Sequence, residues 1–272
     1  GYDTIGIGKC HFTPDRTALR GFRRRLKQEE VPPRIDDDDY LQFLRHSPYR
    51  QIRDVHGTWG DMIYRPQTSP LPPDHHPSQW VGDQTIHYIE EESTQPGHAP
   101  WFAFCSFIHP HPPYAPPAPW DEIYDPDEVD PPHLPEGYES RQNRFIQEAL
   151  HNYYLTPPVS PDLWRVMKAR YYACISFVDH QIGRVLRALE TTGQLENTVI
   201  FFASDHGDML GDLGLLAKED MYGPAVRIPL IMRLPDCTDG GKRISTAVSL
   251  VDVAATILGV AGVGTPKSWD GE

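Results

Sequence analysis

Short apolar runs bounded by glycine, proline or polar residues recur along the chain and predict buried β-strands. The first is TIGIG at residues 4–8, and a second covers residues 101–107, just before a cluster of prolines. Two further runs, NTVIFFASD at residues 197–205 and RIPLIMRLP at residues 227–235, are nearly continuous in apolar residues. Such runs are typical of strands covered on both faces, as in parallel sheets.

Two stretches with apolar residues at helical spacing alternate with these runs. Residues 80–92 predict a short amphipathic helix, and residues 161–192 predict a long one that starts at a proline and stops before Gly193. A helix as long as the second is expected to pack on a sheet. The alternation predicts an α/β fold with a mainly parallel central sheet sandwiched by helices.

Two polar segments rich in proline, residues 15–75 and 110–161, are predicted to be loop-rich excursions. The run of four aspartates at residues 36–39 is expected to be a solvated surface or the start of a helix. The longest apolar stretch, residues 248–263, contains Asp252, so we expect no membrane span.

Charge and cysteine content narrow the function classes. The 272 residues include 25 Lys and Arg against 38 Asp and Glu, a net charge of -13. This balance argues against a nucleic acid partner, because binding a phosphate backbone requires clustered lysine and arginine. Four cysteines without a Cys-x-x-Cys pair are too few for a disulfide scaffold, and they leave the redox compartment open.

Candidate chemistry begins where the strand at residues 197–205 ends. Asp205 offers a carboxylate oxygen and His206 an imidazole nitrogen, both usable by one divalent cation, and Gly207 allows a sharp turn. Two ligands do not complete any metal site. The alternative is that the Asp-His pair caps a following helix together with Asp208.

Basic side chains follow two other strands. Lys9 and His11 are two positions apart, so they would share a face if the first strand continued through them. His109 and His111 lie in the proline-stiffened stretch HPHPP after the strand at residues 101–107. An electropositive pocket for a small tetrahedral anion, as phosphoryl or sulfuryl transfer needs, is predicted from Lys9, His11, His111, Lys218 and a cation at Asp205 and His206.

The same segments resemble the sulfatases of the alkaline phosphatase superfamily over nearly the whole chain. GYDTIGIGKCHF is similar to that family's strand ending in Gly-Lys-x-His, and SFIHPHPPYAPP to its Pro-His-x-Pro loop. The long helix, strand and turn at residues 171–212, which contain FFASDHGDMLGD, carry the most specific likeness. Residues 248–263 resemble a later helix of the family. The resemblance implies an alkaline phosphatase-like fold and hydrolysis of sulfate esters of a sugar or an aryl alcohol.

The resemblance also implies roles for single residues. Asp205 and His206 would be metal ligands, and Lys9 and Lys218 would bind sulfate oxygens. His11 and His111 would contact the sulfate or protonate the leaving alcohol. The cation expected from the family is Ca²⁺, with Mn²⁺ or Zn²⁺ as alternatives because one ligand is a histidine. Family members are often periplasmic or secreted, and an oligomer is possible.

The chain departs from the family pattern in two places. Leu213 stands where related turns carry a histidine, and none of the four cysteines lies in the Cys/Ser-x-Pro-x-Arg motif that the family oxidises to formylglycine. We therefore expect residues 1–272 to be a partial sulfatase domain, inactive alone, whose parent carries the nucleophile upstream and a smaller subdomain downstream. Two alternatives stay open: a phosphonate monoester or phosphodiester hydrolase on the same scaffold, and a non-catalytic protein that binds anions.

Overall fold

The computed structural model describes residues 1–32, 34–58, 66–138, 160–218 and 220–271. Its strands are β1 (Asp3–Gly8), β2 (Arg24–Lys27), β3 (Trp101–Ser106), β4 (Ile200–Ala203) and β5 (Leu230–Arg233). Its α-helices are α1 (Asp39–Arg45), α2 (Pro77–His87), α5 (Pro161–Thr191), α6 (Gly223–Val226) and α7 (Leu250–Val260). Within the described residues, none of the helices has both the length and the apolar composition needed to cross a bilayer.

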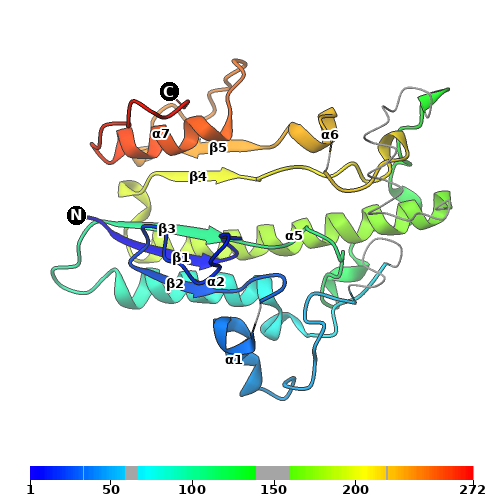
Figure 1. Ribbon diagram of the computed structural model, residues 1–272, viewed down its shortest axis with the longest axis horizontal. Coiled ribbons are helices and arrows are strands. Elements are labelled where there is room, and N and C mark those ends of the chain that lie inside the picture. Colours follow the sequence, from blue (N-terminus) through cyan, green and yellow to red (C-terminus); the bar gives the residue numbers. More distant parts are fainter. Residues whose placement is uncertain (33, 59–65, 139–159, 219, 272) are drawn as a thin grey trace.

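Three parallel strands form the first sheet, in the order β2-β1-β3. Ile5 of β1 pairs with Arg24 of β2 on one side and with Ala103 of β3 on the other, so the three strands end at one edge (Figure 1). The predicted α/β class with a parallel sheet is confirmed. The parallel arrangement places the segments that follow β1, β2 and β3 side by side.

Strands β4 and β5 form a separate antiparallel pair in the described part of the chain. The expectation that both would be covered on each face is wrong for these strands: Phe202 is 39% exposed and Ile231 is 61% exposed. The apolar pattern reports residue type, whereas coverage depends on which elements pack on each face. In Figure 1, β4 and β5 lie beside the parallel sheet, with α7 next to β5.

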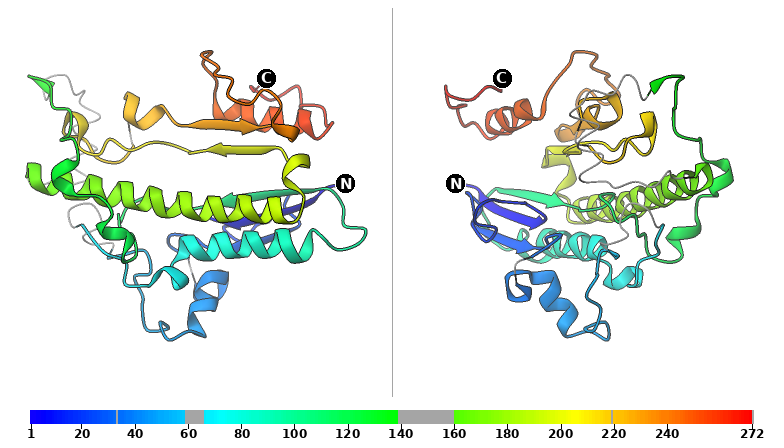
Figure 2. Two further views of the ribbon diagram at one scale, coloured as in Figure 1. Left: turned by 180° about the vertical axis from the view of Figure 1, so that it is seen from behind. Right: turned by 45° about the vertical axis from the view of Figure 1, so that its right-hand side comes forward.

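The predicted helices are present, with small changes at their ends. α5 runs as a single helix from Pro161 to Thr191, and the Ser160 side chain caps it by accepting a hydrogen bond from the Leu163 N–H. α2 begins at Pro77, earlier than predicted, and continues into a π-helical turn, η4 (Tyr88–Glu92). α2 packs against both α5 and the parallel sheet (Figure 2).

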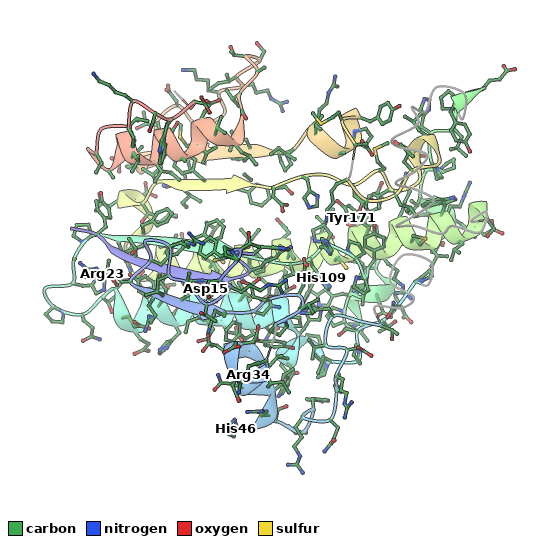
Figure 3. All side chains as sticks on the ribbon, viewed as in Figure 1. Asp15, Arg23, Arg34, His46, His109 and Tyr171 are labelled. Carbon is green, nitrogen blue, oxygen red and sulfur yellow. The ribbon has the colours of Figure 1, made fainter. Side chains whose placement is uncertain are left out.

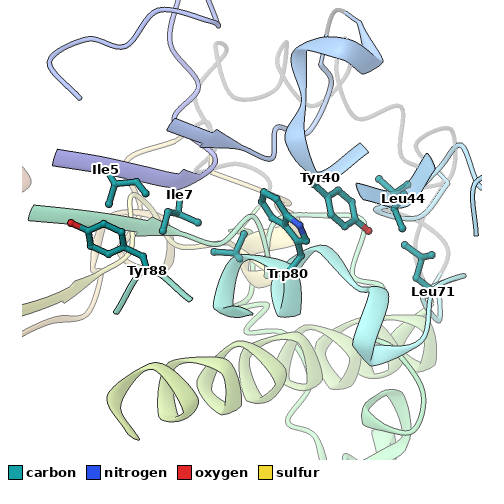
Figure 4. Packing of buried hydrophobic residues seen from close by; sticks show 9 residues of the cluster. Ile5, Ile7, Tyr40, Leu44, Leu71, Trp80 and Tyr88 are labelled. Carbon is teal, nitrogen blue, oxygen red and sulfur yellow. The ribbon is translucent and has the colours of Figure 1, made fainter. Parts of the chain in front are cut away.

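The main core fills the space between the parallel sheet, α1 and α2 (Figure 4). Ile5 and Ile7 of β1 and Val81 of α2 belong to this core, and all three side chains are at most 1% exposed. Tyr40 of α1 meets Trp80 edge-on at a ring-centroid distance of 5.7 Å. This packing anchors the parallel sheet, and with it the loops at the strand ends.

The 15–75 segment contains two elements that its polar pattern does not predict. β2 has the sequence RRLK and still pairs with β1 over its whole length. α1 starts in the aspartate run, where the buried Asp38 accepts hydrogen bonds from the N–H groups of Leu41 and Glu29, both at 2.8 Å. One of the two interpretations of that run, a helix start, is therefore confirmed. In the second excursion, the regular elements of residues 110–137 are two short 3-10 turns, and residues 139–159 lie outside the described part.

Candidate anion-binding site

The segments following the three parallel strands bring together charged side chains from distant parts of the sequence. Lys9 follows β1, Glu30 lies three residues beyond β2, and His111 follows β3. Lys9 Nζ forms an ion pair with Glu30 Oε1. The three side chains are only 12% to 15% exposed, so these contacts lie largely out of solvent.

His111 connects this group to Lys218, which lies between β4 and α6. The Nδ1 of His111 is 2.8 Å from the carbonyl oxygen of Pro112. Because a carbonyl oxygen can only accept, Nδ1 carries the proton, and the lone pair on Nε2 accepts a hydrogen bond from Lys218 Nζ at 2.8 Å. Burial, the largest influence, lowers the pKa of His111, and Lys218 and Lys9 act in the same direction against Glu30. The imidazole is therefore neutral near pH 7.

Glu30 keeps its negative charge in this setting. Burial alone would raise the pKa of its carboxyl, but the His111 ring, Lys9 and Lys218 together outweigh that effect and hold the pKa below its usual value. Glu30 Oε1 is also 3.6 Å from His111 Nδ1. Two lysines, one neutral histidine and one carboxylate thus form what we call the strand-end cluster: Lys9, Glu30, His111 and Lys218.

The turn after β4 places Asp205 and His206 near this cluster. The rings of His206 and His111 lie 6.4 Å apart, centroid to centroid, at 68°. Gly207 permits the tight turn, because a Cβ there would lie 1.9 Å from the backbone oxygen of Pro224. No helix begins at residues 206–211, so the alternative in which the pair caps a following helix is wrong.

Asp205 and His206 offer two donor atoms to a cation. The Nδ1 of His206 donates to the Gly207 carbonyl at 2.8 Å, which leaves the Nε2 lone pair 3.5 Å from Asp205 Oδ2. No group of three or more histidine, cysteine, aspartate or glutamate side chains in the described ranges is arranged to hold a metal ion. The two residues alone therefore do not fit a complete metal site.

Asp208 turns inward rather than toward solvent. Its Oδ2 accepts from the hydroxyl of the buried Tyr114 at 2.8 Å, and its Oδ1 accepts from the N–H of Leu210 at 2.9 Å. Burial raises the pKa of the Asp208 carboxyl, while these hydrogen bonds and Lys218 oppose the shift. The hydrogen bond between Tyr114 and Asp208 links the proline-rich segment after β3 to the turn after β4.

The model of the sulfatase family, described as Sulfatase, matches residues 1–263. The chain belongs to the sulfatase family. It is 29% identical over 290 residues to an arylsulfatase of Clostridium perfringens, covering 100% of this chain and 58% of the relative. It is also 29% identical over 268 residues to a choline-sulfatase of Rhizobium meliloti, covering 97% of this chain and 51% of the relative. The chain thus spans between half and three-fifths of the length of these two relatives.

A solved structure of a phosphonate monoester hydrolase has a similar fold. The phosphonate monoester hydrolase of Silicibacter pomeroyi superposes with a TM-score of 0.79 at 24% identity, covering 100% of this chain and 58% of that chain. At this level of identity the likeness concerns the fold. It establishes that the two sheets and their helices follow the architecture shared by sulfatases and phosphonate monoester hydrolases.

Two histidines of this sulfatase domain lie outside the strand-end cluster. β1 ends at Gly8, so the condition under which Lys9 and His11 would share a strand face is not met. His11 is exposed with φ 52°, and its N–H donates to Glu29. His109, labelled in Figure 3, is buried, and neither of its ring nitrogens has a hydrogen-bond partner among the described residues. Burial lowers its pKa to about 3. His109 is thus part of the interior.

The cysteines of the sulfatase domain do not resemble activated nucleophiles. All four are free thiols. Burial raises the pKa of Cys10, Cys105 and Cys174, the reverse of what a nucleophilic thiol needs. Cys237 is exposed in a 3-10 turn after β5. Leu213 packs against the small core formed by Met209, Leu215 and Ala225.

Sequence reasoning missed Glu30. Its strand, β2, is mostly charged and gives no apolar signal, so nothing marked the following residues as a strand end. The available signal was the pair Glu29-Glu30 between short polar segments, which is indistinguishable from a solvated charge run.

Proposed function

We propose that the parent protein hydrolyses sulfate monoesters, and that Lys9 and Lys218 bind the sulfate oxygens. The observation that carries this proposal is that Lys218 contacts His111 and that Lys9 is linked to the same histidine through Glu30, in a chain of the sulfatase family. Fixed ammonium groups in a half-buried site stabilise charge on the non-bridging oxygens as the ester bond breaks. The substrate would be a small sulfated sugar or aryl alcohol.

The same contact offers a source for the proton that the leaving alcohol needs. As the sulfur–oxygen bond breaks, the departing oxygen takes up a proton. Lys218 Nζ and His111 Nε2 share one over 2.8 Å, and we assign proton supply to this pair. His11, which the family resemblance also offers for this role, is kept as a second candidate because its exposed ring is open to a bound substrate.

We propose that Asp205 and His206 are two ligands of a divalent cation whose other ligands lie outside the described residues. Ca²⁺ is the first choice, and Mn²⁺ or Zn²⁺ the alternatives. A bound cation would supply further charge stabilisation for the sulfate. Titration of the full-length protein with each metal should show one site that D205N and H206A both weaken, and binding unchanged by both variants would reject the assignment.

We further propose that the nucleophile, a formylglycine, belongs to a part of the parent protein outside these 272 residues, so that residues 1–272 alone bind the anion without turning it over. The absence of a Cys/Ser-x-Pro-x-Arg motif and the raised thiol pKa values support this. Sequencing the gene upstream of Gly1 tests it directly. If the gene has no such motif, the chain is better assigned as a non-catalytic anion-binding protein.

Activity assays on the full-length protein test the reaction itself. The proposal expects hydrolysis of 4-nitrophenyl sulfate, with loss of activity when the motif cysteine is replaced by alanine. The second candidate is a phosphonate monoester or phosphodiester hydrolase, favoured by the Asp205-His206 pair and compatible with the shared fold. A preference of more than about a hundredfold in kcat/KM for a phosphonate monoester or a phosphodiester would favour that second candidate.

A further inference from the structure

Glu30 is an unexpected member of a site meant to bind anions. Its carboxylate pairs with Lys9 and lies 3.6 Å from the His111 ring, and its side chain is only 12% exposed. Most carboxylate–lysine pairs of a protein surface are solvated and contribute little. This one is half-buried, and it lies among the basic groups assigned to the substrate.

The neighbouring residue, Glu29, already stabilises the turn that carries Lys9, so Glu30 is not needed for that structural role. Glu29 is buried, pairs with Arg25 at 3.0 Å, and accepts hydrogen bonds from the N–H groups of Cys10 and His11. It therefore holds the turn that carries Lys9. Within the described part of the chain, the Glu30 carboxylate accepts no hydrogen bond from a backbone N–H, and its interactions are with the side chains of Lys9, His111 and Lys218.

The charge on Glu30 matters for the anion that the site accepts. Ionised Glu30 reduces the positive charge of the strand-end cluster by one unit. An added negative charge a few ångströms away penalises a dianion twice as strongly as a monoanion, because the Coulomb energy scales with the charge of the ligand. Screening by solvent is reduced in a half-buried site.

The chemistry of ester head groups gives this difference a consequence. A sulfate monoester carries one negative charge near neutral pH, and so does a phosphonate monoester or a phosphate diester. A phosphate monoester carries close to two, since its second pKa is about 6. A carboxylate fixed beside the binding lysines therefore disfavours phosphate monoesters more than the other three classes.

We propose that Glu30 is a specificity-determining residue that makes this site selective for monoanionic tetrahedral esters over dianionic ones. The inference rests on the proposed function, because it takes the strand-end cluster as the anion site. It covers the sulfatase and the phosphonate monoester hydrolase alternatives equally, since both have monoanionic substrates.

The test compares two ligands with the same tetrahedral head: methyl sulfate, a monoanion, and inorganic sulfate, a dianion. Their dissociation constants are measured by calorimetry on the 272-residue chain at low ionic strength. E30Q is expected to raise the affinity for sulfate relative to methyl sulfate by about tenfold, as one unit of charge at this range would. E30D keeps the charge and is expected to keep the ratio of the wild type.

The matched control is E92Q. Glu92 pairs with Arg24 at 2.6 Å on η4 and is 33% exposed, so this change removes the same charge away from the strand-end cluster. Its ratio should equal that of the wild type. Circular dichroism confirms that each variant is folded.

The outcomes separate the two proposals. An unchanged sulfate to methyl sulfate ratio in E30Q, with binding intact, overturns the role of Glu30 and leaves the anion site standing. Equal weakening of both ligands in E30Q shows that Glu30 only positions Lys9, which also overturns the inference. If the wild type binds neither ligand, or if K218A binds methyl sulfate as well as the wild type does, the anion site itself is wrong and the inference fails with it.

Discussion

His109 provides a quantitative test of the interior, because it is a buried histidine whose ring nitrogens have no hydrogen-bond partner in the part of the chain that the structure describes. Its ring lies 4.8 Å from that of His76, centroid to centroid, and burial lowers its pKa from 6.5 to about 3, with smaller contributions from His56 and His111. The perturbation is H109F, which removes the titrating group and keeps an aromatic ring.

The expected effect depends on pH with a definite sign. In the unfolded chain His109 takes up a proton below its ordinary pKa of about 6.5, whereas the folded chain resists protonation down to a pH of about 3. Acidification between these values therefore favours the unfolded state. At pH 5 the difference corresponds to about 2 kcal/mol of lost stability, and at pH 8 to nearly none. The H109F variant lacks this loss.

The measurement is urea unfolding of the wild type and H109F at pH 8 and pH 5, followed by circular dichroism. The stability of H109F relative to the wild type should rise by about 2 kcal/mol on going from pH 8 to pH 5. Steric costs of the larger ring cancel in this comparison, because they are the same at both pH values. H109L gives a second variant of different shape.

The control is H46F, which alters an exposed histidine at the end of α1, far from His109 in Figure 3. This variant measures the effect of a histidine-to-phenylalanine change outside the interior, and the result for H109F is compared with it. Parallel pH curves for the wild type, H109F and H109L between pH 8 and pH 5 would refute the reasoning, since they would mean that His109 titrates alike in both states.

Three further variants test the turn after β4 and the anion site. G207A places a methyl group 1.9 Å from the Pro224 backbone oxygen and should lower the unfolding free energy by about 3 kcal/mol in the same urea assay. Its control is G259A, in α7 with open space around its Cβ position, which should raise the unfolding free energy by up to about 1 kcal/mol. Y114F removes the hydroxyl that donates to Asp208 and should cost about 2 kcal/mol; an unchanged urea midpoint would show that this bond is not formed. K218A removes an ammonium group and should weaken methyl sulfate binding by about tenfold in calorimetry, with K242A, an exposed lysine, as the control.

Much of the fold could be predicted because apolar spacing reports burial directly. The α5 stripe predicted a helix over residues 161–192, and the helix ends at Thr191. β3 was predicted over residues 101–107 and spans 101–106. β2 could not be predicted, because its four residues RRLK owe their strand conformation to hydrogen bonds with β1 rather than to any apolar pattern.

The residues of the candidate site were likewise only partly predictable from the sequence. The sequence marked Lys9, His111 and Lys218 as candidates for one pocket, and the structure brings them together. It also marked His11, whose position depended on where β1 ends. The positive φ angles at Gly8 and His11 end the strand before His11, and the amino-acid sequence does not specify those angles.

The sequence by itself determined the α/β class, the long helix, the positions of three strand ends and the sulfatase family, because these follow from residue periodicity and from local motifs. Only the tertiary structure decided that Glu30 pairs with Lys9, that His109 is buried while His111 contacts Lys218, and that β4 pairs with β5. The physical reason is that charge pairing, burial and strand partnership are relations between residues far apart in the chain. These relations are set by how the helices and strands pack, and the order of residues along the chain does not give the distances between packed elements.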